Sequence, residues 1–580
     1  MPTPPPPATL PLPLPALTAA RSRAHALGLA GVLALCALLL WFGLGSYALL
    51  NNNEGLYATV AEEMLARGQW LMPHLNGVPY PEKPPLFYYL LAASFALFDG
   101  NAWSARAISA LAASVTLLLI YASVRRESGS VAPARLAALI CVSSLGFIML
   151  ARTVMPDALL AMFFVAAMLG SFHAARSGSR RLLAASLAAL ALAVLVKGLL
   201  SLLLYGLIWA LWILWRWRSD GRALLRFHAD WRAWSVFAII ALPWHIAAML
   251  HYDGFAWVYF WNEHVLRFLG RRIPLDTYTG GALYYVPRIV LLFFPWVVLL
   301  PRAIRVGTNG TAPALASFSL LAMGIIVTFF SAASAKANYY VALAIPFAAV
   351  WLALRLSEFE QPPRLELVVV AALGVAIIAA AIWAVGREVR WDTVFARSEW
   401  SGLAPGAVLL AIALWGAWRV LHHGLNRWLL IAGTPLVVLA LALGLTNTLE
   451  GRLSARKLIA SAEEACGTCE LMLYRDLESV SAAPFYSDQA VVPVIDSDSA
   501  DLWWGRQWRP DAATFIDNRD AFAQARDGAP IMVLVPRHLL REFLASPLGM
   551  HADLLARRAG AGVYRLVVPR SAIYPEIPLP

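Results

Sequence analysis

Long apolar segments recur along most of this 580-residue chain, and they constrain its fold more than any other feature. A helix needs about 20 mainly apolar residues to cross a bilayer, whereas a transmembrane strand needs only about 10 that alternate in polarity. The segments here are long and unbroken, and charged residues make up only 14% of the chain, against roughly 25% in soluble proteins. They predict an all-α polytopic membrane bundle. About thirteen spans are expected, near residues 27–50, 102–123, 133–150, 156–175, 182–196, 199–215, 234–250, 284–301, 313–333, 339–356, 365–386, 404–420 and 428–447.

The two ends of the chain differ from the bundle at 27–448. Residues 1–26 are rich in proline and predict a disordered tail. Residues 449–580 carry an ordinary share of charged residues and short apolar runs such as IMVLVP and GVYRLVVP, which predict a small soluble α/β domain. A local disulfide within the CGTC pair, Cys466 and Cys469, is expected if this domain lies outside the cytoplasm.

Basic residues concentrate in alternate loops, with a marked cluster in WRWRSDGRALLRFHADWR at 215–232. Because cytoplasmic loops collect Lys and Arg, this bias predicts a cytoplasmic N-terminus and a C-terminal domain outside the cytoplasm. The net charge of +11 follows from the same bias, so no nucleic-acid partner is expected. In this orientation, residues 51–101 and 251–283 form two long outer loops.

Polar and ionisable residues gather at the predicted outer ends of the spans. Each has an ordinary explanation, such as a helix cap, a snorkelling lysine or a structural histidine. Ionisable groups beside a bilayer are costly and usually functional, so their convergence on one side predicts a single outer cavity. The set consists of Asn53, Glu54, Glu82, Lys83, Asp157, Lys197, His264, Arg267, Lys336 and Tyr340.

This set suits a reaction on a phosphorylated lipid. Carboxylates can deprotonate an acceptor or hold a metal, and Lys and Arg suit a phosphate leaving group. The chain has no Walker motif, nucleophile elbow, HExxH or dinucleotide fingerprint, so a nucleotide cofactor and ATP-driven transport are disfavoured. We expect a transfer reaction on the outer face. A flippase or transporter of lipid-linked sugars is the alternative.

The order of motifs supports a family. The first outer loop reads NEGLYATVAEEMLARGQWLMPHLNGVPYPEKPP, and RTVMPDALLAMF, VKGLL, WNEHVLRFLGRR and AKANYYVALAIP follow. This text, over about residues 25–360, resembles the GT-C glycosyltransferases of the protein O-mannosyltransferase superfamily, particularly the bacterial aminoarabinose (lipid A) transferase branch. The resemblance implies an inner-membrane enzyme that moves a sugar from a polyprenyl-phosphate carrier to a periplasmic acceptor, by inverting displacement. The acceptor would be a lipid A-like glycolipid, another glycan or a protein.

The resemblance also implies roles for single residues. Glu82 and His264 match a metal pair, for Zn²⁺ or a similar divalent ion. Donor-phosphate contacts are implied for Lys83, Lys197 and Arg267. Substrate contacts near the cavity are implied for Lys336 and Tyr340.

One position departs from the family pattern, which has an Asp-Glu pair where this chain has Asn53 and Glu54. Asparagine cannot act as a base, which leaves Asn53 a substrate contact. Glu54 or Asp157 then takes the role of base, or the protein uses another acceptor, or its activity is impaired.

Overall fold

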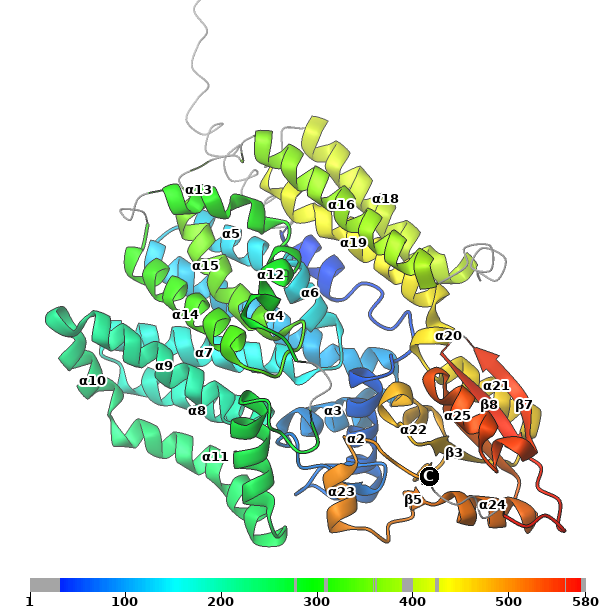
Figure 1. The fold of residues 1–580 in the computed structure, drawn as a ribbon. Helices are drawn as coiled ribbons and strands as arrows, with labels where there is room; N and C mark the ends of the chain where they lie inside the picture. The colour runs from blue at the N-terminus through cyan, green and yellow to red at the C-terminus, as the bar shows by residue number, and fades with distance from the viewer. Residues whose placement is uncertain are drawn as a thin grey trace, which may run out of the picture.

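The computed structural model describes residues 32–275, 279–306, 311–357, 364–388, 400–422, 427–558 and 560–574, with residues 359 and 362. The predicted tail at 1–26 lies outside these residues. Figure 1 shows a large helical part, followed in the chain by a smaller domain in which strands and helices alternate. The predicted combination of a membrane bundle and a small C-terminal domain with a sheet is confirmed.

The helical part begins with α2 (Asn53–Arg67) and ends with α19 (Trp428–Thr448). Between them lie α3 (Leu86–Phe98), α4 (Ala102–Ser128), α5 (Val131–Val142), α6 (Leu145–Arg152), α7 (Pro156–Ser177), α8 (Arg180–Lys197), α9 (Leu200–Trp215), η1 (Trp217–Gly221), α10 (Arg222–His228), α11 (Trp231–His251), η2 (Trp257–Leu266), η3 (Ala282–Tyr284), α12 (Tyr285–Leu292), η4 (Trp296–Leu299), α13 (Leu300–Arg305), α14 (Pro313–Ala332), η5 (Tyr340–Ala344), α15 (Ile345–Leu356), α16 (Arg364–Glu388) and α18 (Trp400–His422).

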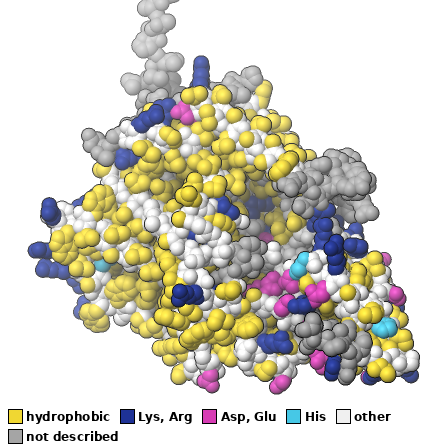
Figure 2. Space-filling view, in the orientation of Figure 1, with side chains coloured by type: hydrophobic (Ala, Val, Ile, Leu, Met, Phe, Trp, Pro, Cys, Tyr) yellow, Lys and Arg dark blue, Asp and Glu magenta, His cyan; other side chains and the backbone are white. Residues whose placement is uncertain are grey.

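Among the described residues, six helices are long and apolar enough to span a membrane, or up to nine if each of three bent pairs forms one span. The bends are 65° between α5 and α6, 90° after α9 and 101° between α12 and α13. The predicted total of about thirteen is not confirmed. Several predicted spans are short or sharply broken, and a hydropathy pattern does not show a bend. Hydrophobic side chains cover much of the helical part on the face in Figure 2, and basic side chains gather at its edge near η1 and α10.

The first apolar run does not continue as a helix to residue 50. Residues 32–40 are helical, and the chain then passes through turns into an extended stretch. Arg106 of α4 holds that stretch, because its guanidinium donates to the carbonyls of Leu44, Tyr47 and Ala48. A buried cation thus satisfies backbone groups that a helix would have satisfied internally.

The first outer loop folds into α2, a hairpin and α3. Strands β1 (His74–Leu75) and β2 (Val78–Pro79) pair antiparallel around Asn76 and Gly77. Both turn residues have positive φ, 53° and 88°, as a type I′ turn requires. Glu63 of α2 accepts hydrogen bonds from the backbone N–H groups of both, which ties the turn to the helix.

The C-terminal domain is built on a six-stranded sheet in the order β5-β4-β3-β6-β8-β7. The first four strands are parallel, and β8 and β7 add antiparallel at one edge. The strands are β3 (Glu470–Tyr474), β4 (Val494–Ile495), β5 (Phe515–Ile516), β6 (Ile531–Pro536), β7 (Ala552–Arg558) and β8 (Ala561–Leu566). The helices are α20 (Glu450–Leu453), α21 (Arg456–Cys466), η6 (Glu478–Val480), α22 (Ala483–Tyr486), α23 (Trp503–Trp508), α24 (Asn518–Arg526), η7 (Arg537–Leu539), α25 (Leu540–Ala545) and η8 (Gly549–His551).

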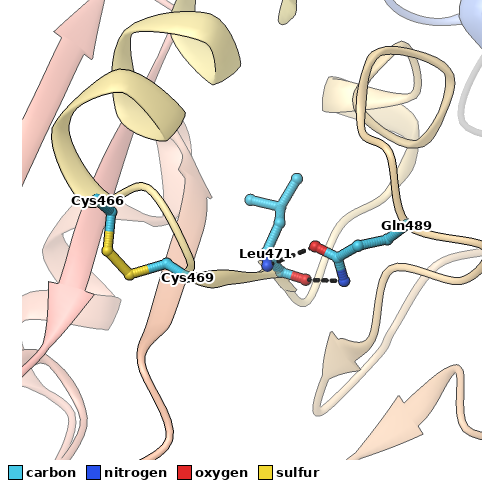
Figure 3. Close-up of a disulfide and its surroundings, with 4 residues drawn as sticks. All are labelled: Cys466, Cys469, Leu471 and Gln489. Atoms are coloured by element: carbon cyan, nitrogen blue, oxygen red, sulfur yellow. Dashed lines mark hydrogen bonds between the residues drawn. A yellow bond between two sulfur atoms is a disulfide. The ribbon is translucent and has the colours of Figure 1, made fainter.

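A disulfide joins Cys466, at the end of α21, to Cys469, just before β3 (Figure 3). Beyond it, the side chain of Gln489 pairs with both backbone groups of Leu471, at 2.6 and 3.2 Å. These links fix the entry into the central strand β3. The local disulfide expected from the CGTC pair is therefore present.

The C-terminal domain docks on the first outer loop. The side chain of Asn76 pairs with both backbone groups of Val492, at 2.7 and 2.8 Å. Gly55 of α2 lies so close to the domain that a Cβ there would stand 2.4 Å from the backbone of Ala482. The two parts of the chain therefore meet backbone to backbone.

Candidate active site

A cavity of about 760 Å³ opens where the first outer loop, α9, η2 and the end of α14 meet. Most of its wall is apolar, and its polar residues come from the loop segments and helix ends. It is lined by Glu82, Lys83, Lys197, Leu199, Leu200, Leu202, Leu203, Leu207, Phe260, Glu263, His264, Val265, Arg267, Phe268, Leu269, Phe329, Phe330, Ala333, Ala335 and Tyr340. Of the ten residues predicted for the site, the cavity wall contains six: Glu82, Lys83, Lys197, His264, Arg267 and Tyr340.

Lys197 links the cavity to Asp157. The lysine ends α8, the aspartate stands in the first turn of α7, and their side chains form a 2.5 Å hydrogen bond. The ammonium of Lys197 also lies 4.9 Å from the ring centroid of Tyr340 and 5.6 Å from that of Tyr339. Asp157 is buried, and its second carboxylate oxygen accepts no hydrogen bond within the described part of the chain. Asp157 itself does not belong to the cavity wall and is connected to it through Lys197.

Four charged side chains form a network beside Lys83. Arg272 bridges Glu82 and Glu263, and Arg267 donates to Glu263 at 2.9 Å. Burial raises the pKa of Glu82, but Arg272, Lys83 and Arg267 outweigh burial and hold that pKa at about 2. Glu82 is therefore ionised at any physiological pH. The network holds cations at the polar end of the cavity although the site is shielded from water.

His264 has both ring nitrogens engaged within the protein. Its Nε2 accepts from the backbone N–H of Leu199 at 3.0 Å, which leaves Nδ1–H to donate to the carbonyl of Tyr259 at 2.6 Å. Burial, together with nearby Lys83 and Arg267, lowers the pKa of His264 from 6.5 to about 4. The ring is therefore neutral, and the lone pair on Nε2 already accepts the hydrogen bond from Leu199.

The residues predicted to bind a metal do not fit a metal ion in this arrangement. A metal on His264 would have to displace the Leu199 N–H, and Glu82 is already paired with Arg272 and Lys83. No group of three His, Cys, Asp or Glu side chains in the described residues is placed to hold an ion. The Glu82–His264 metal site stays a prediction, and no chemical step is assigned to it below.

Glu54 lies away from the cavity, in a buried ion pair. Its two oxygens accept from Arg106 at 2.9 and 2.6 Å, and also from the backbone N–H groups of Val154 and Leu50. Its side chain is 4% exposed and that of Arg106 is 0% exposed. Both carboxylate oxygens of Glu54 therefore already accept hydrogen bonds from groups of the protein itself. The contacts of Glu54 indicate a structural role, and its catalytic role stays a prediction.

Lys336 and Asn53 also lie outside the cavity wall. The ammonium of Lys336 donates to the carbonyls of Phe330 and Ser331, at 2.8 Å each, and so caps the end of α14. Asn53 is the first residue of α2, and Asn52 occupies the cap position without a side-chain capping bond. The neighbouring Asn51 faces the C-terminal domain instead, where its side chain accepts from Ala482. The predicted substrate contacts of Lys336 and Asn53 are not supported by this geometry.

Comparisons with known proteins agree with this arrangement. Residues 27–260 match the family model described as dolichyl-phosphate-mannose-protein mannosyltransferase. A curated relative from Aeromonas salmonicida, named undecaprenyl phosphate-alpha-4-amino-4-deoxy-L-arabinose arabinosyl transferase, is 27% identical over 84% of this chain and 90% of its own length. Over these regions the chain is similar to the family of that model and to the arabinosyl transferase relative, in agreement with the resemblance found in the sequence.

Two further matches support the family and the fold. A Shewanella sediminis protein of the same name is 31% identical over 58% of this chain, and the match spans 61% of that relative. The solved structure of ArnT from Cupriavidus metallidurans bound to undecaprenyl phosphate superposes with a TM-score of 0.77 at 20% identity, covering 93% of this chain and 97% of that one. The similarity in fold therefore extends through the C-terminal domain.

Sequence reasoning missed several residues of the candidate site. Arg272 and Glu263, which form the ion-pair network with Glu82, are not among the residues predicted from the sequence. Tyr57 of α2 lies within electrostatic range of both Asp157 and Glu82. The sequence did contain a signal for Arg272 and Glu263, because a carboxylate that becomes buried needs a cation near it, either in the chain or in space.

Proposed function

We propose that this protein transfers a sugar from a polyprenyl-phosphate carrier to an acceptor on the outer face of the inner membrane. The cavity carries the proposal, because its mostly apolar wall also contains the cationic side chains of Lys83, Lys197 and Arg267. An amphipathic ligand with a hydrocarbon chain and a phosphate matches both features. The names of the curated relatives support a 4-amino-4-deoxyarabinose donor on undecaprenyl phosphate, and lipid A is the acceptor we propose.

The leaving phosphate would meet Lys83, Lys197 and Arg267. All three side chains line the cavity, and charge-assisted hydrogen bonds to phosphate are among the strongest that proteins make. Their positive charge stabilises the negative charge that develops on the phosphate oxygen as its bond to the anomeric carbon breaks. Lys197 exchanges its bond with Asp157 for the phosphate when the donor binds.

Asp157 is the base we propose. The acceptor hydroxyl oxygen attacks the anomeric carbon from the side opposite the phosphate, and its proton passes to the carboxylate of Asp157. The carbon–oxygen bond to the phosphate breaks in the same displacement, and polyprenyl phosphate leaves. This step inverts the anomeric configuration. Asp157 suits the role because it is buried beside Lys197 and keeps one oxygen without a partner among the described residues.

The experiment uses the purified full-length protein in nanodiscs. It is given undecaprenyl phosphate-linked 4-amino-4-deoxyarabinose and a lipid A acceptor, and both released undecaprenyl phosphate and modified lipid A are measured. We expect the two products in equal amounts. Transbilayer movement of the donor without either product would replace the proposal by the flippase alternative.

We further propose that the N-terminus is cytoplasmic and the C-terminal domain periplasmic, as the distribution of basic residues indicates. Labelling of intact spheroplasts with a membrane-impermeant reagent tests this orientation. A single reactive cysteine at exposed Asp553 should be labelled from outside, and one at exposed Arg218 should react only after lysis. The reverse pattern would overturn the orientation.

A further inference from the structure

The C-terminal domain reaches the active site through α23 and the residues just before it. A Cβ on Gly505 would stand 2.4 Å from the side chain of Val78, so α23 packs directly on strand β2 of the first outer loop. The indole N–H of Trp508 donates to the carbonyl of Asp253 in the second outer loop, at 2.9 Å. One short helix of the C-terminal domain therefore contacts both loops that bound the cavity.

This docking places Asp501 next to residues of the active site. Its carboxyl group lies within electrostatic range of Glu82, Lys83 and Arg272. It also acts on the hydroxyl groups of Tyr57 and Tyr88, and Tyr57 in turn lies within range of Asp157. Asp501 is separated from all of these residues by more than two hundred positions in the sequence, yet it lies within electrostatic range of Glu82, Lys83 and Arg272.

Asp501 and Tyr88 both lack the hydrogen bonds that their surroundings would lead us to expect. The hydroxyl of Tyr88 is buried, with the residue 1% exposed, and makes no hydrogen bond in the described structure. The backbone N–H of Asp501 donates to Glu478 at 2.8 Å, but its carboxyl group has no hydrogen-bond partner among the described residues. Burial, with Glu82 and Glu478 nearby, raises the pKa of Asp501 well above its ordinary value. Its carboxyl oxygens can accept hydrogen bonds in either protonation state.

Unfilled buried hydrogen-bonding capacity is costly, and a site that keeps it commonly uses it on a ligand. The Tyr88 hydroxyl and the Asp501 carboxyl group do not line the cavity themselves, but both lie within electrostatic range of Glu82, which does. A hydroxyl and a carboxyl group match the hydroxyl groups of a sugar ring, which both donate and accept hydrogen bonds. We propose that Asp501, supplied by the C-terminal domain, binds a hydroxyl or amino group of the transferred sugar together with Tyr88. The inference rests on the proposed function, because it places the sugar next to the carrier phosphate.

The test compares the binding of two lipids to the full-length protein, so it does not depend on turnover. The probes are undecaprenyl phosphate and undecaprenyl phosphate-linked 4-amino-4-deoxyarabinose. We expect Asp501→Ala to weaken the binding of the sugar-bearing lipid about tenfold, the loss of about one hydrogen bond to a substrate group, and to leave the binding of the bare carrier within about twofold. Tyr88→Phe should act in the same direction, and Asp501→Asn should recover part of the loss.

Asp498→Asn is the matched control, because Asp498 belongs to the same domain but pairs with Arg475 at the surface. Equal losses for both lipids in Asp501→Ala, or no loss for either, would overturn the inference. Equal binding of the two lipids by the wild-type protein would overturn it as well. A wild-type protein that prefers the sugar-bearing lipid but releases no undecaprenyl phosphate would refute the proposed function and leave this inference standing.

Discussion

At the scale of single residues, the position of a carboxylate decides whether it acts in chemistry or in the fold. Glu54 and Asp157 are both buried and both paired with a cation. Glu54 has its accepting positions filled by Arg106 and two backbone N–H groups, whereas Asp157 keeps an oxygen without a partner in the described structure. The two residues should therefore fail in different ways when they are changed.

Asp157→Asn should lower kcat for sugar transfer by about 10²–10⁴-fold, because the amide cannot take the acceptor proton. Its thermal stability should fall less than that of Glu54→Gln, because the amide oxygen still accepts from Lys197 and the pair is less completely buried, with side chains 11% and 10% exposed. Asp99→Asn, at an exposed position after α3, is the control. Product release measured at saturating donor checks the prediction, and full activity of Asp157→Asn would remove Asp157 from the mechanism.

Glu54→Gln should destabilise the protein, because it leaves the buried charge of Arg106 uncompensated. Breaking a buried ion pair costs about 3–5 kcal/mol, so we expect a clearly lower melting temperature in detergent and a low yield. Arg106→Gln should show the same loss. A Glu54→Gln protein that melts like the wild type but has lost transfer activity would restore Glu54 as a catalytic residue.

His264 predicts a dependence of stability on pH. Its pKa is lowered from 6.5 to about 4 by burial, so the unfolded chain takes up the proton first as the pH falls. The stability due to the neutral ring is fully present above pH 6.5 and is lost progressively as the pH falls toward 4. Melting temperatures at about pH 7 and about pH 5 should differ more for the wild type than for His264→Gln. His251→Gln, at an exposed histidine, should behave like the wild type.

At the scale of elements, close backbone contacts hold α2 against the C-terminal domain. Gly55 leaves no room for a Cβ, since Ala482 backbone atoms would lie 2.4 Å away. Gly55→Ala should therefore push the domain from the first outer loop, lower the melting temperature and expose the connection after α19 to protease. Gly206→Ala in α9, where a Cβ would meet nothing within 4 Å, should leave both measurements unchanged or slightly improved. An undisturbed Gly55→Ala protein would contradict this docking.

At the scale of the whole molecule, the cavity unites a face of α9 with loops that lie far apart in the sequence. Leu203 and Leu207 of α9 line it, whereas Leu211 of the same helix does not. Leu203→Trp should narrow the apolar wall and raise KM for an undecaprenyl carrier several-fold, but not for a carrier with a short chain. Leu211→Trp should change neither value. If Leu203→Trp raised KM equally for both carriers, the hydrocarbon chain of the carrier would have to bind elsewhere.

The sequence by itself determined the membrane character, the separate C-terminal domain and six of the polar residues that line the cavity. These conclusions rest on local features: long apolar runs, a low content of charged residues and ionisable residues at the ends of the spans. Local features can be recognised without a structure. Lys83, Lys197 and Arg267 were found in this way, because each stands beside a helix end or in a motif that resembles the family.

Only the tertiary structure decided which polar groups pair with one another. Glu54 meets Arg106 across 52 positions, and Lys336 turns back on the end of α14, so neither contact follows from spacing along the chain. The same holds for Asp501, which comes to Glu82 through the docking of a domain whose sequence carries no recognisable motif. Burial and pairing depend on distances in space, and the order of residues along the chain does not give those distances.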